Sequence, residues 1–163
     1  MIHLEKINNE NVWDVLGLKL KREQKHFLAP NYVSLSQAYA AIGSECKAFP
    51  FAIYNDNKVI GFLMIGYNIS VIYDKDYTPP SVYKNNYYLW RLMIDKRYQK
   101  KGYGTEVVKL ALDFIRTWPC GEAEYCALSY EPENEVAIKW YHSMGWVENG
   151  ETDSEEVVCV LKL

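Results

Sequence analysis

The chain has 163 residues, which is long enough for one domain with a sizeable core and too short for two ordinary ones. Apolar residues make up 49% of it and charged residues 24%, the balance typical of a globular protein. The net charge of -3 argues against a general nucleic-acid binder, which needs a basic surface to displace counterions.

The cysteines form no Cys-x-x-Cys pair, so we expect neither a metal site nor a disulfide framework. They are scattered at Cys46, Cys120, Cys126 and Cys159. The first residues lack the apolar stretch of a signal peptide, and no segment approaches the roughly 20 apolar residues that span a bilayer. We therefore expect a cytoplasmic protein that does not engage a membrane.

The N-terminal part is expected to contain one strand and two or three helices. Alternating apolar and polar residues predict a strand over residues 2–7. Asn9 or Asn11 could cap a helix that continues to Phe27. A second helix is expected to begin at Ser34. The buried face of this second helix is expected to carry Leu35, Ala38, Tyr39 and Ile42.

A β-hairpin is the clearest local structure in the chain. Residues 49–54 and 58–69 are rich in aromatic and β-branched residues, and the turn residues 55–57 lie between them. The polar, proline-containing segment 70–86 then predicts a long connection, and connections of this length are often functional.

The C-terminal half alternates strands and helices. Residues 87–94 predict a buried central strand, apart from Arg91. The next helix is expected to end at Pro119. Its buried face is expected to carry Val107, Leu110, Ala111, Phe114 and Trp118. Then follow strand 123–130, helix 133–144, strand 146–147 and strand 157–163, the last two joined through polar residues 148–156. We expect a single domain over residues 1–163, with a mixed α/β sheet of about seven strands, about four helices and a central strand-helix-strand crossover.

The segment between strand 87–94 and the following helix has the features of an anion cradle. Its glycines let the backbone approach a ligand closely, and the helix start offers free N–H groups and a positive dipole end. Lysine and hydroxyl side chains add donors, so the segment suits a pyrophosphate. The residues concerned are Gln99, Lys100, Lys101, Gly102, Tyr103, Gly104 and Thr105.

Two known phosphate cradles are absent, namely the Gly-x-x-x-x-Gly-Lys-Ser/Thr pattern and the Gly-x-Gly-x-x-Gly pattern. An ordinary strand-to-helix turn with basic surface residues would explain a lone Gly-x-Gly. The segment from Gln99 to Gly104 resembles the Arg/Gln-x-x-Gly-x-Gly/Ala signature of the GNAT acetyltransferase superfamily. About thirty residues later, Asn134, Ala137 and Tyr141 match the family's Asn-x-x-Ala-x-x-x-Tyr element.

The resemblance implies acetyl-CoA as co-substrate, a mostly antiparallel GNAT-like sheet, and roles for individual residues. The strand end Leu92-Met93-Ile94 would pair with the pantetheine arm, and the Met93 N–H would polarise the thioester oxygen. Asn134 would hydrogen-bond the arm and Ala137 would leave room for it. Tyr141 would give a proton to the leaving thiolate, although a simple core tyrosine is the plainer explanation without the signature. The base stays open among Glu23, Glu131 and Glu133.

The acceptor is predicted from the N-terminal half. Gln24 to Tyr39 resembles a bacterial spermine/spermidine (diamine) acetyltransferase branch, which implies a polyamine acceptor. A polyamine site needs carboxylates along an extended cation and aromatic walls for its methylenes. The candidate substrate residues are Glu23, Phe27, Trp90 and Arg91. Further acids could come from Glu151, Asp153 and Asp74 or Asp76, and further walls from Trp13 and Tyr32. Arg91, in an apolar strand, should have a partner carboxylate such as Glu23 or Glu131.

Two alternatives stay open from the sequence. The acceptor could be an antibiotic amine, an amino acid or a protein N-terminus instead of a polyamine. The chain could also be a non-catalytic acetyl-CoA-binding module, although the intact signature weighs against this. A homodimer is implied only by the resemblance.

Overall fold

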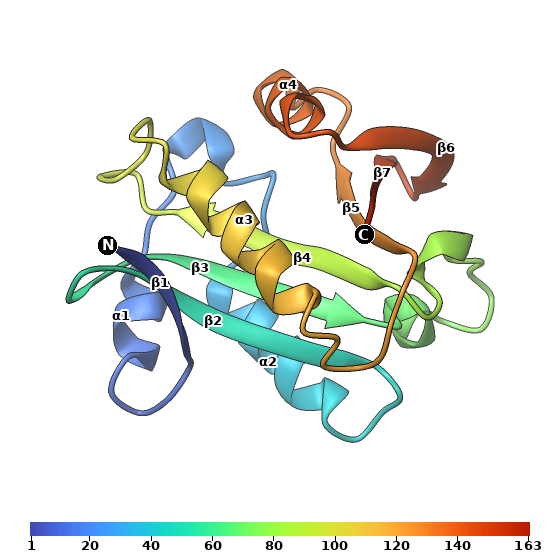
Figure 1. Ribbon diagram of the computed structural model, residues 1–163, viewed down its shortest axis with the longest axis horizontal. Helices are drawn as coiled ribbons and strands as arrows, with labels where there is room; N and C mark the ends of the chain where they lie inside the picture. The colour runs from blue at the N-terminus through green and yellow to red at the C-terminus, as the bar shows by residue number, and fades with distance from the viewer.

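Figure 1 shows the computed structural model, which describes residues 1–163 as one sheet with helices on both faces. The strand order is β1-β2-β3-β4-β5-β7-β6, and only β4 and β5 pair in parallel. The strands are β1 Ile2–Lys6, β2 Lys47–Asn55, β3 Lys58–Tyr67, β4 Tyr87–Ile94, β5 Tyr125–Tyr130, β6 Val147–Asp153 and β7 Glu156–Lys162. The helices are α1 Val12–Gly17, α2 Asn31–Ala41, α3 Tyr103–Ile115 and α4 Glu135–Ser143. The predicted mixed α/β fold is confirmed, and no helix is both long and apolar enough to cross a bilayer.

The sheet separates two apolar cores. One core packs α3 against the sheet through residues such as Val107 and Ala111, and side chains of α4 lie against it. The other core contains Val15 of α1 and Ala41 of α2. We call these the α3/α4 face and the α1/α2 face. In Figure 1, α3 crosses in front of the strands while α2 lies behind them.

The hairpin predicted between β2 and β3 is confirmed. The two strands pair from Lys47 with Tyr67 to Asn55 with Lys58. Asp56 in the turn has a positive φ of 52°, a conformation that Asp and Asn tolerate better than most residues.

The junction of β4 and β5 is short and opens toward their C-terminal ends. Only two residue pairs join the strands, Tyr87 with Cys126 and Tyr88 with Ala127. Beyond them the strands separate, as Figure 1 shows, while β4 stays paired with β3 as far as Ile94. In open α/β sheets, ligands bind at such a gap at the carboxyl ends of parallel strands.

A β-bulge lies in β4 beside this gap. Arg91 pairs with Met64 and Leu89 pairs with Ile65, so Trp90 is an extra residue in the strand. A bulge bends its strand and changes the direction of the following side chains.

Several predicted boundaries in the N-terminal half are wrong. The first helix ends at Gly17, not at Phe27, because Leu18 is extended, and only a short 3-10 helix (Arg22–Gln24) follows. The second helix begins after Pro30 and not at Ser34, which is buried within it. The expected buried face is also misplaced, since Tyr39 and Ile42 are 78% and 75% exposed.

The C-terminal half departs from expectation at two places. Helix α3 ends at Ile115, and Trp118 lies beyond it with a positive φ of 55°. The polar residues after Val147 were expected to form a connection, but they are the strand β6, which pairs at the edge of the sheet. An edge strand needs no apolar alternation, because its outer side faces solvent.

Candidate active site

The glycine turn before α3 presents a row of free backbone donors. The N–H groups of residues 99–104 have no acceptor within the chain. Gly102 is the N-cap of α3 with φ 81°, and a side chain added there would meet no protein atom within 4 Å. Lys100 and Lys101 are exposed beside it. Free amides, a helix start and two cations together form a site that fits a pyrophosphate.

The first turn of α3 is fixed to α4 by Trp140. Its indole Nε1 donates to Thr105 Oγ1 at 3.1 Å. A Cβ on Gly104 would lie 3.0 Å from the same indole ring, so glycine allows the close packing. Thr105 and Gly104 therefore position α4 as well as the turn.

Two polar side chains hold the turn against the end of β4. Gln99 Nε2 donates to the carbonyl of Ile94 at 2.9 Å and to Gln24 Oε1 at 2.8 Å. The buried Asp95 carboxylate accepts from the Lys19 N–H at 2.8 Å and from Arg97 Nε at 2.8 Å. Burial opposes ionisation of Asp95, but the hydrogen bonds from Arg97 and Lys19 outweigh it and lower its pKa. The side chain of Gln99 thus shapes the cradle, while its backbone N–H remains free.

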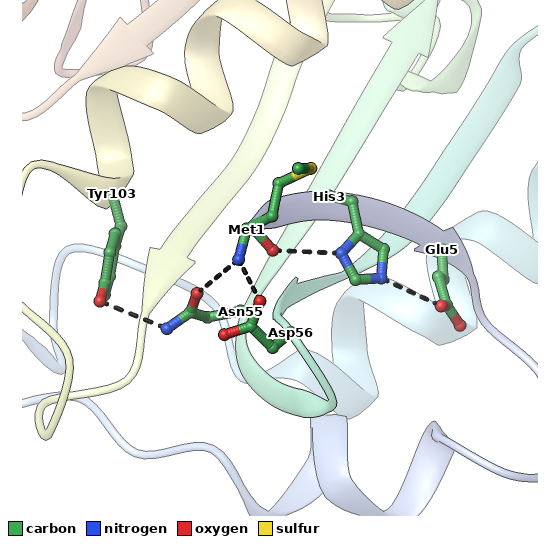
Figure 2. A network of polar contacts seen from close by, with 6 residues as sticks. All are labelled: Met1, His3, Glu5, Asn55, Asp56 and Tyr103. Carbon is green, nitrogen blue, oxygen red and sulfur yellow. Dashed lines mark hydrogen bonds and ion pairs between the residues drawn. The ribbon is translucent and has the colours of Figure 1, made fainter.

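Tyr103 ties the same turn to the β2–β3 hairpin. Its hydroxyl accepts from Asn55 Nδ2 at 3.3 Å (Figure 2). Figure 2 also shows Asn55 and Asp56 binding the amino group of Met1. Tyr103 therefore anchors the start of α3, and its hydroxyl already has a hydrogen-bond partner within the chain.

The open edge of β4 begins where β5 departs. The Asp95 N–H donates to Ile60 O at 2.8 Å. Hydrogen-bonded pairs alternate along an antiparallel ladder, so the Met93 N–H, two residues earlier, also points toward β3. The expectation that Met93 supplies the free N–H is therefore wrong. Leu92 and Ile94 carry the N–H groups that point to the open edge.

Helix α4 carries the three residues of the later signature. Asn134 is its N-cap, and its Oδ1 accepts from the Ala137 N–H at 3.2 Å, which leaves the amide Nδ2 for another partner. Tyr141 packs on Trp140 and Trp146, at ring-centroid distances of 4.7 and 5.9 Å. Burial raises the pKa of Tyr141, and the nearby Cys126 thiol and Tyr88 raise it further. The Tyr141 hydroxyl thus stays protonated at neutral pH and can act as a donor.

A cleft of about 800 Å³ opens on the α1/α2 face. It reaches the part of β4 that lies beside the gap, and the bulge there brings Trp90 and Arg91 into the same cleft. Its aromatic walls are Phe27, Tyr73, Tyr88 and Trp90. Its carboxylates are Glu131, Asp153, Glu155 and Glu156. The cleft is therefore acidic, with Arg91 as its single arginine.

The connection 70–86 contributes a tyrosine cluster that holds the β6–β7 hairpin. The Asp153 carboxylate accepts from the hydroxyls of Tyr73, Tyr77 at 2.9 Å and Tyr83 at 3.1 Å. The Ser154 N–H donates to the Tyr77 hydroxyl at 2.7 Å. The acidic side of the cleft is thereby fixed in place.

A second chain of hydrogen bonds starts from the same cluster. The Tyr83 hydroxyl, whose one proton can go either to Asp153 or to Tyr88, lies 3.3 Å from Tyr88 OH. Tyr88 OH in turn lies 2.6 Å from Ser129 Oγ. Ser129 Oγ in turn donates to the Glu156 carboxylate. The sequence did not identify these residues as a group, because they come from β4, β5 and β7 and share no local pattern.

Some predicted acceptor residues lie elsewhere. Glu23 is exposed on the 3-10 helix and does not line the cleft, and neither does Glu133. Of the three candidate bases, only Glu131 lines it. Among the further candidates, Asp153 does so while Trp13 and Tyr32 are exposed outside it.

Arg91 lacks the partner carboxylate expected for it. Its guanidinium donates to the Trp90 carbonyl at 2.8 Å and to Gln37 Oε1 at 3.4 Å. No carboxylate lies within 4.0 Å of the guanidinium, and the buried Nε has no partner. Burial lowers the pKa of Arg91, and the more distant Tyr88 and Glu156 oppose this shift.

The sequence matches the acetyltransferase (GNAT) family over residues 18–146. It is 28% identical to the spermine/spermidine N(1)-acetyltransferase of Bacillus subtilis (strain 168), over 99% of each chain. The fold is similar to that of PaiA N-acetyltransferase from Thermoplasma acidophilum in complex with coenzyme A (TM-score 0.68, 16% identity, 100% and 99% of the two chains). It is also similar to aminoglycoside acetyltransferase AAC(6')-Ib in complex with coenzyme A (TM-score 0.72, 13% identity, 99% and 95% of the two chains).

Proposed function

The chain belongs to the acetyltransferase (GNAT) family and is an acetyl-CoA-dependent N-acetyltransferase, and on this premise we propose that its acceptor is a polyamine such as spermine or spermidine. The observation that carries the proposal is the acidic, aromatic cleft beside the β4–β5 gap. Its carboxylates suit an extended polycation, and its aromatic faces suit methylene and ammonium groups. The full-length similarity to a spermine/spermidine acetyltransferase supports the same acceptor.

Acetyl-CoA supplies the activated acetyl group, and the chain offers residues that fit each part of it. The free amides of residues 99–104 would hold the pyrophosphate, with Lys100 and Lys101 adding charge. The open edge of β4 and the free Nδ2 of Asn134 would bind the pantetheine arm. Ala137 keeps the facing surface of α4 small.

Two donors would assist the transfer. The Leu92 N–H, on the open edge of β4, would hydrogen-bond the carbonyl oxygen as negative charge develops on it. The protonated Tyr141 hydroxyl would donate to the sulfur as the C–S bond breaks, so that the thiolate does not leave unaided.

The acceptor is tested by thiol release from acetyl-CoA over a panel of amines. The panel holds spermine, spermidine, a four-carbon diamine, kanamycin, free amino acids and a peptide with a free N-terminus. We expect kcat/KM for spermine or spermidine to exceed that of every other class at least tenfold. A higher value for an aminoglycoside or a peptide would overturn the proposal, and so would calorimetric binding of acetyl-CoA with no turnover of any amine.

A second acceptor class is favoured by one observation. Arg91 lines the cleft, and no carboxylate lies within ion-pair distance of its guanidinium. An acceptor that carries a carboxylate beside its amine, such as an amino acid, would pair with it. In the same panel, an Arg91→Met variant should lose turnover of amino acids while keeping that of spermidine, if both classes are substrates.

A further inference from the structure

Three cleft residues form an uninterrupted line of hydrogen bonds on the α1/α2 face. Tyr88 on β4, Ser129 on β5 and Glu156 on β7 all line the cleft. Tyr88 OH and Ser129 Oγ are 2.6 Å apart, and Ser129 Oγ contacts the Glu156 carboxylate. The line starts in the last residue pair before β4 and β5 separate, where Tyr88 lies opposite Ala127.

The hydrogen bonds in this line are all donated in one direction, from Tyr88 toward Glu156. A serine hydroxyl has one proton, and Ser129 gives it to the Glu156 carboxylate. The proton between Tyr88 and Ser129 must therefore come from Tyr88. When a proton arrives at the Tyr88 oxygen, each hydroxyl can pass its own proton to the next group and receive another. The net result is that Glu156 becomes protonated.

The line and Tyr141 approach the gap from opposite faces of the sheet. Side chains alternate along a strand, so Ser129 shares the α1/α2 face with Ala127, which lies in the core on that face. Tyr141 belongs to α4 and packs with the α3/α4 core. An acid on one face and a base on the other would keep the two proton transfers apart.

Charges around Glu156 favour a carboxylate that accepts protons. Burial raises its pKa, and the carboxylates of Asp153 and Glu131 raise it further, while the Ser129 hydrogen bond and Arg91 oppose this. Burial also raises the pKa of Tyr88 to about 12, so its hydroxyl transmits a proton without ionising. The other charged and titratable groups that line the same cleft are His26, Tyr73, Tyr88, Arg91, Glu131, Asp153 and Glu155.

We propose that Glu156 is the general base of this enzyme and that Tyr88 and Ser129 relay the acceptor's proton to it. The acceptor ammonium loses one proton to the Tyr88 oxygen, Tyr88 passes its proton to Ser129, and Ser129 passes its own to Glu156. The acceptor becomes a neutral amine with a free electron pair, and Glu156 becomes a carboxylic acid. The base returns its proton to solvent through the open cleft. This inference rests on the proposed function, because the relay is needed only if the acceptor binds as an ammonium ion, as a polyamine would.

Glu156→Gln tests the relay through the pH dependence of turnover. The amide keeps an oxygen for the Ser129 hydrogen bond but accepts no proton. At neutral pH we expect kcat for spermidine to fall about 100-fold, the lower range for a general base. The rate of the variant should then climb toward that of the wild type as pH approaches about 10.4, because the amine increasingly arrives neutral. A weakly basic amine that is already neutral at pH 7 should be acetylated at nearly the wild-type rate.

Glu155→Gln is the matched control, because it removes a neighbouring cleft carboxylate outside the relay. It should raise KM for spermidine and leave the pH profile of kcat unchanged. Tyr88→Phe should reproduce the loss seen in Glu156→Gln, and the double variant should be no slower than either single one. Additive losses, or a Glu156→Gln effect on KM alone at every pH, would overturn the relay.

The protonation of Glu156 can be followed without any substrate. A ¹³C NMR titration of the side-chain carboxyl carbons should show one glutamate with a pKa above its usual value, and that signal should vanish in Glu156→Gln. A Glu156 signal that titrates at the ordinary value would contradict the proposal. Failure of spermidine as a substrate is detected separately with the wild-type enzyme, and the relay is then tested with whichever amine turns over.

Discussion

Asp95 lies directly after β4 and joins that strand to the segment before the 3-10 helix. Its carboxylate accepts from the Lys19 N–H at 2.8 Å, from the Arg97 N–H at 3.0 Å and from the Arg97 guanidinium. The side chain is 1% exposed. We expect Asp95→Asn to destabilise the protein, because an amide offers one oxygen where the carboxylate offers two.

The size of the effect follows from the donors that lose a partner. If the amide oxygen keeps the Arg97 N–H, the amide NH₂ faces the Lys19 N–H, and that backbone donor is left unpaired. An unsatisfied buried donor costs about 1–3 kcal/mol. The Arg97 guanidinium is exposed to solvent, so it adds little. For a domain of this size, a loss of about 2 kcal/mol lowers Tm by about 4–8 °C.

Urea unfolding at two pH values measures the effect and its electrostatic part. The pKa of Asp95 is lowered in the folded protein, so the stability it contributes is present above the unfolded value of 3.8 and is lost as pH falls through the folded pKa. The wild type should therefore exceed Asp95→Asn by about 2 kcal/mol at pH 7. The difference should shrink below pH 3.8.

Asp113→Asn is the control for this experiment. Asp113 is an exposed partner of Arg116 at 3.9 Å, and its change should stay within about 0.5 kcal/mol. A loss of similar size in both variants would refute the argument from Asp95. So would an Asp95→Asn loss that does not change between pH 7 and acid.

Three further predictions concern the cradle and α4. Tyr141→Phe should lower kcat about 100-fold or more and leave acetyl-CoA affinity nearly unchanged by calorimetry, and an unchanged kcat would remove its role as acid. Gly102→Val should weaken acetyl-CoA binding at least tenfold because the side chain obstructs the free amides. Gly121→Val carries the same positive-φ strain, with φ 102°, and should keep the affinity; equal weakening would mean that strain alone is responsible. Trp140→Phe should lower the free energy of unfolding by about 1 kcal/mol through the lost hydrogen bond to Thr105, so equal stability would show that this bond contributes nothing.

The sequence predicted best those elements that local rules determine. The β2–β3 hairpin follows from two β-rich runs around turn residues, and Asp56 adopts the positive φ that such a turn requires. The glycine turn was predicted for the same reason, because Gly102 and the start of α3 are adjacent in the chain.

The errors come from contacts between distant segments. The first helix ends early where the Lys19 N–H donates to the Asp95 carboxylate and the Lys19 carbonyl accepts from the Lys96 N–H, just after β4. Those partners lie more than seventy residues away, so no periodicity near Gly17 could reveal them. Pro30 is the N-cap of the second helix, although the side chain of Ser34 is chemically better suited to capping.

The proposed cofactor residues were easier to assign from the sequence than the proposed acceptor residues. Gly102, Asn134 and Tyr141 belong to two compact signatures, and each lies at the turn or on α4 where the signatures require. Glu156 stands in an ordinary acidic run, and only Ser129 on a neighbouring strand distinguishes it from Glu155. Its environment exists only after the strands have paired.

The short β4–β5 junction also bears on how long the folded chain survives. Only two residue pairs connect strands β1-β2-β3-β4 to strands β5-β7-β6. Acetyl-CoA bound between β4 and β5 would add contacts that hold these two parts of the sheet together. A ligand present at 100 times its Kd stabilises the folded state by about 2.7 kcal/mol. The population of the transiently opened chain, which proteases attack, would then fall to about one hundredth. Resistance to degradation would therefore increase with the concentration of acetyl-CoA, and the enzyme would persist longest where its co-substrate is abundant.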